Sequence, residues 1–233
     1  MGKWLISIAA VALLVGISSG QSPAIEQIDR LFSWGEDASR DRRALDLIEQ
    51  GLAADGNNYQ LLWRASRSYY HVGERAPKND RINAYNQGIK TGEKATAVNV
   101  NGVEGHYWLG ANIGGYCEED GGISALRNTR RLRAEMEAVI RLQPEYDRAN
   151  AFLALGQLDC HLPRLLGGSL QRGTAYLERG LQLAPQNFEI KLALAQAYID
   201  AGRRDDARRQ LNEVVAGPPG TNREQARKLL TKL

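Results

Sequence analysis

The sequence has 233 residues, of which 24% are charged, and its formal net charge is +3. This charge is too near balance to indicate a nucleic-acid partner, because nucleic-acid-binding domains carry a concentrated excess of lysine and arginine. Beyond the N-terminal segment no stretch is apolar enough to cross a membrane, which excludes a protein with several transmembrane helices.

The first 20 residues have the order that is typical of a secretory signal peptide. Lys3 precedes an apolar run from Trp4 to Val15, and small residues follow as far as Gly20. The run is shorter than the ~20 residues that cross a bilayer, so we expect export and cleavage near Gly20, with an uncleaved anchor as the alternative. No cysteine follows the run, so it is not an ordinary bacterial lipoprotein signal. We therefore predict a periplasmic or cell-envelope protein.

The rest of the chain shows a repeat of helix pairs. The clearest unit begins at Phe188 and has small residues, an aromatic residue at Tyr198 and a glycine turn at Gly202 with the spacing of a tetratricopeptide (TPR) repeat. This unit predicts helices over about 189–201 and 205–215. We therefore predict an all-α fold, in which antiparallel TPR-like helix pairs form a superhelical stack.

The same template recurs upstream and divides the chain into five pairs. The second and third pairs require an insertion between their helices, and the fourth has a longer turn, "HLPRLLGGS". A capping box of Thr221 and Glu224 begins a last helix that closes the stack. The predicted pairs cover residues 25–58, 59–102, 103–148, 149–187 and 188–221, and the capping helix covers residues 222–233.

The stretch "HYWLGANIGGYCEEDGG", residues 106–122, is unusually rich in glycine for a helix. In the repeat register it is the first helix of the third pair, and Gly110 and Gly114 lie one turn apart on one side of it. Each glycine costs about 1 kcal/mol of helix propensity relative to alanine, so close packing or a ligand must compensate. No strand precedes the stretch and no "GK[ST]" follows, which argues against a phosphate loop. We expect the glycines to allow close helix packing or to widen a pocket.

Histidines and cysteines near this stretch carry atoms that could bind a metal. His106 and Cys117 are three helical turns apart, and Cys160 and His161 are adjacent and point in different directions, so we predict no metal site. Cys117 and Cys160 fall at the C-terminal ends of the first helices of successive pairs, at similar heights. We therefore predict a disulfide between them, with two buried thiols as the alternative.

The concave face of such a superhelix is the expected binding surface, and the first helix of each pair lines it. The repeat register places on this face Gln60, Trp63, Arg67, Tyr70, His71, Glu104, Tyr107, Ala111, Gly114, Asn150, Leu153, Gln157, Glu189 and Gln196. Aromatic residues and an arginine on an open surface are typical of a binding hot spot. The alternative is that Trp63 and Tyr70 belong to the core between repeats.

Enzymatic residues are not apparent in the sequence. Nothing resembles a nucleophile with its base, and no carboxylate pair can be placed in a cleft. The second helices are rich in arginine, but interleaved acidic residues indicate a solvated convex face rather than a site for a polyanion. We therefore predict a non-enzymatic protein without a cofactor that binds other proteins.

Three features together resemble the T component of TRAP transporters. These are "GHYWLGANIGGY" on one helix, the extended turn "LPRLLGGSLQRGTAYLERGLQLAP", and a regular last repeat. The eukaryotic regulators of microtubule dynamics are similar over the same turn, but the signal peptide favours a bacterial cell envelope. The specific part of the resemblance extends from Gly105 to Pro185.

The resemblance implies a periplasmic TPR-like protein that binds a solute-binding protein, forms homo-oligomers and passes on small apolar ligands. The bacterial relatives are often lipoproteins, whereas this chain lacks the lipid-accepting cysteine, which leaves membrane tethering open. The competing hypothesis is a structural scaffold of the cell envelope that binds protein segments in its concave groove and has no link to transport.

Overall fold

The structure, a computed structural model, describes residues 23–33, 38–121 and 123–233. The predicted signal peptide, residues 1–20, lies outside the described residues. The described part of the chain consists of eleven α-helices and one short 3-10 helix, and contains no strand. None of these helices is long and apolar enough to cross a membrane. The predicted all-α fold is confirmed.

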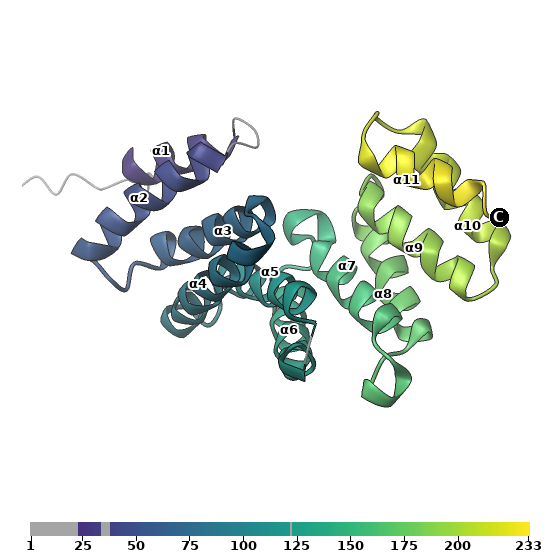
Figure 1. The fold of residues 1–233 in the computed structure, drawn as a ribbon, viewed down its shortest axis with the longest axis horizontal. Helices are drawn as coiled ribbons and strands as arrows, with labels where there is room; N and C mark the ends of the chain where they lie inside the picture. The colour runs from purple at the N-terminus through teal and green to yellow at the C-terminus, as the bar shows by residue number, and fades with distance from the viewer. Residues whose placement is uncertain (1–22, 34–37, 122) are drawn as a thin grey trace, which may run out of the picture.

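The helices follow one another in the order α1 (Pro23–Ser33), α2 (Ala38–Ala54), α3 (Tyr59–Arg75), α4 (Lys78–Val98), α5 (Val103–Asp120), α6 (Ile123–Leu142), α7 (Tyr146–His161), η1 (Arg164–Leu166), α8 (Leu170–Leu183), α9 (Phe188–Asp200), α10 (Arg204–Ala216) and α11 (Thr221–Leu230). Successive helices pack in pairs, from α1 with α2 to α9 with α10, and α11 packs on the last pair (Figure 1). The predicted superhelical stack of TPR-like pairs with a C-terminal capping helix is therefore confirmed.

Polar side chains fix where several helices begin. The side chains of Asn58, Ser169 and Asn187 each accept a hydrogen bond from a backbone N–H in the first turn of α3, α8 and α9. Such caps satisfy backbone donors that have no partner within the helix. The predicted capping box at α11 is wrong, because Thr221 is already helical and the preceding Gly220 occupies the capping position with a φ of 148°.

The insertions that the repeat template required between the helices of the second and third pairs are also wrong. Only Ala76 and Pro77 separate α3 from α4. The additional residues instead lengthen the helices, since α4 has 21 residues and α6 has 20, whereas α9 and α10 each have 13. A longer helix satisfies its backbone internally and can bury more side chains than a loop of the same length.

Glycines allow close packing of the long helices. A Cβ atom on Gly115 of α5 would lie 2.5 Å from the ring of Tyr85 on α4, and one on Gly110 would lie 2.4 Å from Cε of Met136 on α6. A Cβ atom on Gly114, by contrast, would meet no atom within 4 Å. Gly110 therefore allows close helix packing, which was the first of the two expectations for these glycines. Gly114 borders open space, which agrees with the second, a widened pocket.

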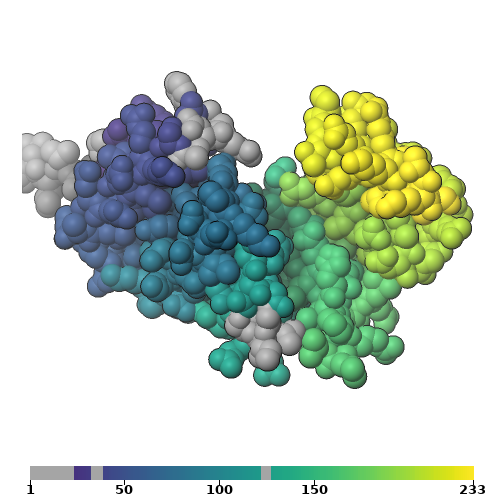
Figure 2. Space-filling model, in the orientation of Figure 1, coloured from purple at the N-terminus to yellow at the C-terminus, as the bar shows by residue number. Residues whose placement is uncertain are grey.

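The stack changes its geometry between α5 and α7. The first helices α3 and α5 pack side by side, as do α7 and α9, whereas α7 packs on α6 and makes no comparable contact with α5. At the start of α7 three successive non-glycine residues, Asp147, Arg148 and Ala149, have φ values of 46°, 56° and 62°. This left-handed backbone is unfavourable for L-residues and redirects the chain. The surface is hollowed between the part that ends with α6 and the part that contains α9 to α11 (Figure 2).

Candidate functional site

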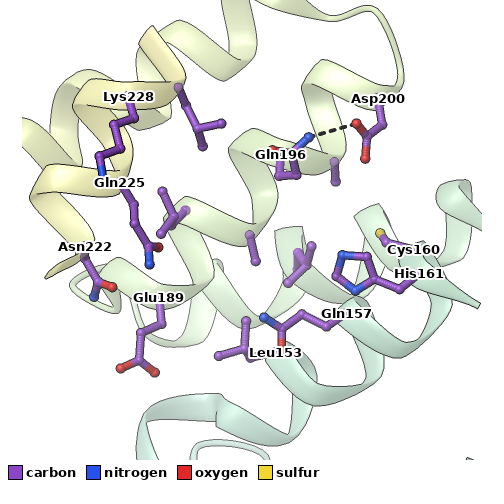
Figure 3. A pocket seen from close by; sticks show the side chains of 15 residues that line it. Leu153, Gln157, Cys160, His161, Glu189, Gln196, Asp200, Asn222, Gln225 and Lys228 are labelled. Carbon is purple, nitrogen blue, oxygen red and sulfur yellow. Dashed lines mark hydrogen bonds between the residues drawn. The ribbon is translucent and has the colours of Figure 1, made fainter. Parts of the chain in front are cut away.

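The hollow between the two parts contains a cleft of about 640 Å³. It lies between α3 and α5 on one side and α7 and α9 on the other, and it continues into a second hollow of about 630 Å³ between α7, α9 and α11 (Figure 3). The two hollows share Leu153, Gln157, His161 and Glu189. We call their combined surface the concave groove.

The floor of the concave groove is apolar. Leu132 and Met136 of α6 line it together with Leu153 and Ala154 of α7, beside Gly114 of α5. α6 is the second helix of its pair and would be covered in a regular stack. Its side chains reach the groove because the backbones of α5 and α7 do not lie close together, although Tyr107 and Asp147 meet at the start of α7. The groove thus offers a recess in which an apolar side chain of a ligand can be buried.

The rim of the concave groove is acidic. Glu74, Glu118, Glu189 and Asp200 line it, against a single lysine, Lys228. Tyr85 donates a hydrogen bond of 2.6 Å to Glu74, and Gln196 donates one of 2.9 Å to Asp200 (Figure 3). No ion pair neutralises any of these four carboxylates within the described part of the chain. The groove is therefore acidic although the whole chain has a net charge of +3.

The environment of Glu118 reflects this excess of carboxylates. Desolvation at the wall of the cleft, followed by the charges of Glu74 and Glu119, raises the pKa of Glu118 above its ordinary value, and His161 only partly opposes the shift. Burial and the two neighbouring carboxylates each disfavour the charged form of Glu118. A cation brought by a ligand would relieve this repulsion.

The predicted face residues divide into two groups in the structure. Those that line the concave groove are Tyr70, Tyr107, Ala111, Gly114, Asn150, Leu153, Gln157, Glu189 and Gln196. Those that the structure places outside it are Gln60, Trp63, Arg67, His71 and Glu104.

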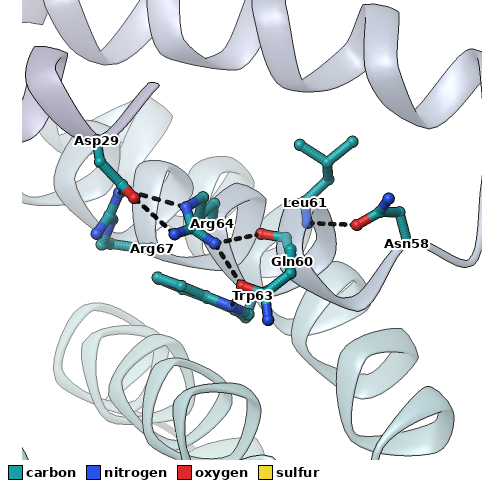
Figure 4. Close-up of polar contacts among 7 residues, drawn as sticks. All are labelled: Asp29, Asn58, Gln60, Leu61, Trp63, Arg64 and Arg67. Carbon is teal, nitrogen blue, oxygen red and sulfur yellow. Dashed lines mark hydrogen bonds and ion pairs between the residues drawn. The ribbon is translucent and has the colours of Figure 1, made fainter. Parts of the chain in front are cut away.

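Trp63 and Arg67 are used in packing rather than exposed in the groove (Figure 4). Trp63 is only 7% exposed, and its indole donates a hydrogen bond of 3.2 Å to Gln60. The guanidinium of Arg67 lies 3.8 Å from the centre of the Phe32 ring and donates a bond of 2.9 Å to Asp29 of α1. Arg67 therefore holds a carboxylate of its own chain. For Trp63 the structure agrees with the alternative, in which it belongs to the core.

The Asp29 carboxylate is also held by Arg64, a buried residue that the repeat register did not assign to the face. Arg64 donates two hydrogen bonds to it, of 2.9 and 2.6 Å (Figure 4). Burial opposes ionisation of Asp29, but the bonds from Arg64 and Arg67 outweigh it and lower the pKa of the carboxyl. This network fastens α1 across the inner side of α3.

A continuous stack of rings covers the inner side of α3 and α5. It runs through Phe32, His71, Trp108, Tyr107 and Tyr146, with neighbouring centroids 5.0 to 5.9 Å apart. Burial, and then the charges of Arg75 and Arg67, lower the pKa of His71 to about 4, which keeps the ring neutral. The predicted site residues His71 and Tyr107 therefore belong to this stack, and Tyr107 donates a hydrogen bond to Asp147.

Glu104 lies at the start of α5 and is held within the chain. The hydroxyl of Tyr59 donates a hydrogen bond of 2.8 Å to it. Tyr59 also accepts a bond of 3.2 Å from the backbone N–H of Gly105. Glu104 therefore joins α3 to α5 and lies apart from the acidic rim.

The predicted disulfide is absent from the structure. Cys117 packs on the core between α5 and α6, whereas Cys160 points at α8, where a Cβ atom on Gly173 would lie 2.5 Å from its sulfur. The prediction assumed that α5 and α7 pack side by side, and they do not. Burial, and then nearby carboxylates, raise the pKa of both thiols to about 11. Among the described residues no group of three or more histidine, cysteine, aspartate or glutamate side chains could hold a metal ion.

Several groove residues were missed by the sequence analysis. Glu74 and Glu118 each follow a predicted face residue by four positions, Tyr70 and Gly114, so helical spacing alone would have found them. Leu132 and Met136 had no such signal, because a second helix lines the groove only where the stack opens.

Models of known protein families match most of the chain. A family model described as "Regulator of microtubule dynamics protein 1-3" matches residues 24–157, and a tetratricopeptide repeat model matches residues 165–233. The first match covers more than half of the chain. A search of curated protein sequences found no match.

Solved structures with a similar fold include the TPR protein TTC0263 of Thermus thermophilus. It has a TM-score of 0.65 and 19% identity, over 89% of this chain and 97% of that one. MamA has a TM-score of 0.56 and 16% identity, over 88% of this chain and 97% of that one. At such identities the likeness shows the TPR-type fold alone.

The predicted membership of the TRAP transporter T-component family is wrong. The family model that matches is that of the regulators of microtubule dynamics. Its match includes the helix with "GHYWLGANIGGY" but ends at residue 157, before the turn on which the likeness to these regulators was based. Stacked helix pairs with glycine-rich contacts are shared by many TPR-like proteins, so these features did not distinguish the two families. The solute-binding protein that this resemblance implied as a partner has no remaining basis.

Proposed function

The chain belongs to the regulator of microtubule dynamics protein 1-3 family, and on this premise we propose that it is a scaffold that holds a segment of another protein in its concave groove. It acts by binding and carries out no reaction. The observation that carries the proposal is the combination of an apolar recess with an acidic rim that no cation of the described chain neutralises.

The recess suits an apolar side chain of the bound segment. Gly114 leaves its side of the cleft open, and Leu153 and Leu132 supply apolar surface at its floor. A buried anchor of this kind supplies much of the affinity in protein interfaces. The groove is also continuous from α3 to α11, which suits an extended or helical segment rather than a small molecule alone.

The rim suits a lysine or arginine on the same segment. Glu74 and Glu118 line one side of the cleft and Glu189 the other, and none of them takes part in an ion pair within the described residues. Complementary charge accelerates association and rejects acidic competitors. We therefore propose a partner segment that is basic and amphipathic.

The cellular location is a separate proposal, which rests on residues 1–20 alone. We propose export to the cell envelope, with cleavage near Gly20. N-terminal sequencing of the protein isolated from its native cells tests this. A chain that still begins at Met1 and sediments with membranes would show that the segment is an anchor.

A selection of peptides from a displayed random library tests the main proposal. We expect the selected peptides to be enriched in lysine or arginine beside an apolar residue, and to bind Gly114→Leu at least about tenfold more weakly than the natural chain. Ala134→Leu is the matched control, because Ala134 is an exposed residue of α6 outside the groove. Equal binding to both variants, or enrichment of acidic peptides, would contradict the proposal.

The family description supports a second candidate, which is direct binding to microtubules. Cosedimentation of the purified chain with polymerised tubulin tests it. If binding occurs and is lost in Gly114→Leu, the concave groove is the surface involved. If the chain stays in the supernatant, the second candidate is rejected.

A further inference from the structure

The turn between α7 and α8 holds two leucines in solvent. Leu165 is 100% exposed and Leu166 is 48% exposed, on the short η1 helix. Single exposed apolar residues are common on protein surfaces, but an adjacent pair at the tip of a projecting turn is not. The concave groove reaches Leu162 and Pro163 at the base of the turn, but neither Leu165 nor Leu166 lines it, so the function proposed above does not use them.

Hydrogen bonds fix the turn, so the exposure of the leucines is a property of the fold. The N–H groups of Leu166 and Gly168 donate to the carbonyl of Pro163 at 2.8 and 3.1 Å, and Arg172 donates to the carbonyl of Gly167 at 2.6 Å. A Cβ atom on Gly168 would lie 1.6 Å from a backbone oxygen of Leu162, so the chain is closely packed there.

A buried ion-pair network supports the base of the turn. The side chain of Asp159 is fully buried and accepts hydrogen bonds from Arg133 and Arg172 at distances of 2.5 to 2.6 Å. Burial opposes ionisation, but these two arginines lower the pKa of Asp159 below its ordinary value. Its backbone carbonyl also accepts a bond of 2.8 Å from the N–H of Ser169.

Arginines without carboxylate partners surround the leucines. Arg127 and Arg130 of α6 line the same surface hollow as Leu165 and Leu166, and Arg164 lies on the turn itself. Within the described residues none of these three arginines takes part in an ion pair, whereas Arg133 and Arg172 are both paired with Asp159. α6 and the turn project toward the same edge of the molecule (Figure 1).

We propose that this leucine–arginine turn, made of Arg127, Arg130, Arg164, Leu165 and Leu166, docks on a membrane surface that contains anionic lipids. The two leucines enter the boundary between headgroups and acyl chains, and the three guanidinium groups contact lipid phosphates. A projecting tip needs a soft surface that closes around it, which a bilayer provides, whereas a protein partner would need a matching recess. The charge of the arginines selects anionic lipids over neutral ones.

Hydrogen–deuterium exchange of the full chain tests the docking site directly. The probe is a set of vesicles of phosphatidylcholine alone or mixed with phosphatidylglycerol. We expect slower exchange in the segment 162–170 with the anionic vesicles and unchanged exchange with the neutral ones. Because this measurement reports the turn alone, binding through residues 1–20 does not affect it. Unchanged exchange in this segment with anionic vesicles would overturn the proposal.

Paired variants give the second measurement, by vesicle flotation. Leu165→Asp with Leu166→Asp should lose the protection of the turn and weaken binding to anionic vesicles by about tenfold or more, with an unchanged melting temperature. Val98→Asp with Val100→Asp is the matched control, because these valines are 42% and 69% exposed on another surface. If the leucine variant floats and is protected like the natural chain, the proposal fails. If the turn binds polyglutamate but not vesicles, the proposal also fails and the partner is an acidic protein instead.

Discussion

The two walls of the concave groove come from one repeat pattern and differ in what their inward side chains do. On the α3–α5 wall the large side chains near the start of each helix make contacts within the protein. Trp63 is buried, Arg67 is paired with Asp29, and the rings of Tyr107 and Trp108 stack on each other. On the α7–α9 wall, by contrast, Leu153, Gln157 and Glu189 remain open to the groove.

This difference shows that an inward direction does not make a residue accessible. α1 is fastened across α3 by Asp29, so Arg64 and Arg67 meet another helix, whereas Tyr70 and Glu74, farther along α3, reach the groove. No described helix covers α7 and α9 in the same way, and the cleft opens beside them. A binding surface is therefore defined by what a neighbouring helix leaves uncovered.

The largest effect on stability is expected for a substitution of Trp63, which tests the difference between the two walls. Trp63→Ala should lower the free energy of unfolding by about 3–5 kcal/mol, because it leaves a cavity in the core. Gln157→Ala on the other wall should change it by less than about 0.5 kcal/mol, since that side chain is exposed. Urea unfolding followed by circular dichroism measures both. A Trp63→Ala protein as stable as Gln157→Ala would mean that the α3–α5 wall is as open as the α7–α9 wall.

A smaller effect is expected at two adjacent glycines of α5. Gly115→Ala should destabilise the fold by about 1–3 kcal/mol, because the new methyl group would lie 2.5 Å from the Tyr85 ring. Gly114→Ala should instead stabilise it by up to about 1 kcal/mol through helix propensity, because its methyl group faces open space. The two melting temperatures should thus move in opposite directions. Equal shifts would show that the cleft beside Gly114 is filled in solution.

The sequence predicted the fold well because the repeat pattern depends on local spacing. α9 and α10 cover residues 188–200 and 204–216, against predictions of 189–201 and 205–215. The groove was predicted less well because it depends on contacts between distant segments. The pairing of Asp29 with Arg67 joins residues 38 positions apart, and no periodicity indicates it.

The opening of the stack could not be predicted either. It accompanies a left-handed backbone at Asp147, Arg148 and Ala149, three residue types that ordinarily favour helix or turn conformations with negative φ. The predicted disulfide failed for the same reason, since it required a regular junction between α5 and α7. Helical spacing could have predicted the acidic rim, because Glu74 and Glu118 share a helix face with residues already assigned to the groove.

A pH effect should distinguish the ring stack of the α3–α5 wall from the rest of the molecule. The pKa of His71 is about 4 in the folded protein, against 6.5 for an ordinary histidine, so the folded state disfavours protonation. Its contribution to stability is complete above pH 6.5 and is lost as the pH falls from 6.5 toward 4. We expect His71→Gln to lose less stability than the natural chain over this window, as measured by urea midpoints.

His106 supplies the matched control for this titration. Its hydrogen bond to Glu135 raises its pKa, so its contribution is fully present below pH 6.5 and is lost as the pH rises through its folded pKa. His106→Gln should therefore show the same acid loss as the natural chain between pH 6.5 and 4. If His71→Gln also follows the natural chain there, His71 is not shielded by the ring stack.

The smallest effect on stability is expected at Glu118, on the rim of the groove. Glu118→Gln should change the free energy of unfolding by less than about 0.5 kcal/mol, because the residue is exposed and holds no ion pair within the described chain.

Peptide binding should respond more to Glu118→Gln, since the variant removes one of the carboxylates that face a basic segment. We expect weaker affinity for lysine-containing peptides and a shallower dependence of that affinity on salt, because fewer charges are screened. Asp205→Asn is the control, as Asp205 is 92% exposed, pairs among the described residues only with Arg208 one turn along its own helix, and lies outside the groove. Isothermal titration of both variants with the same peptide at two salt concentrations measures the affinity and its salt dependence. An unchanged salt dependence for Glu118→Gln would show that the acidic rim takes no part in binding, while the apolar recess, tested by Gly114→Leu, would still stand.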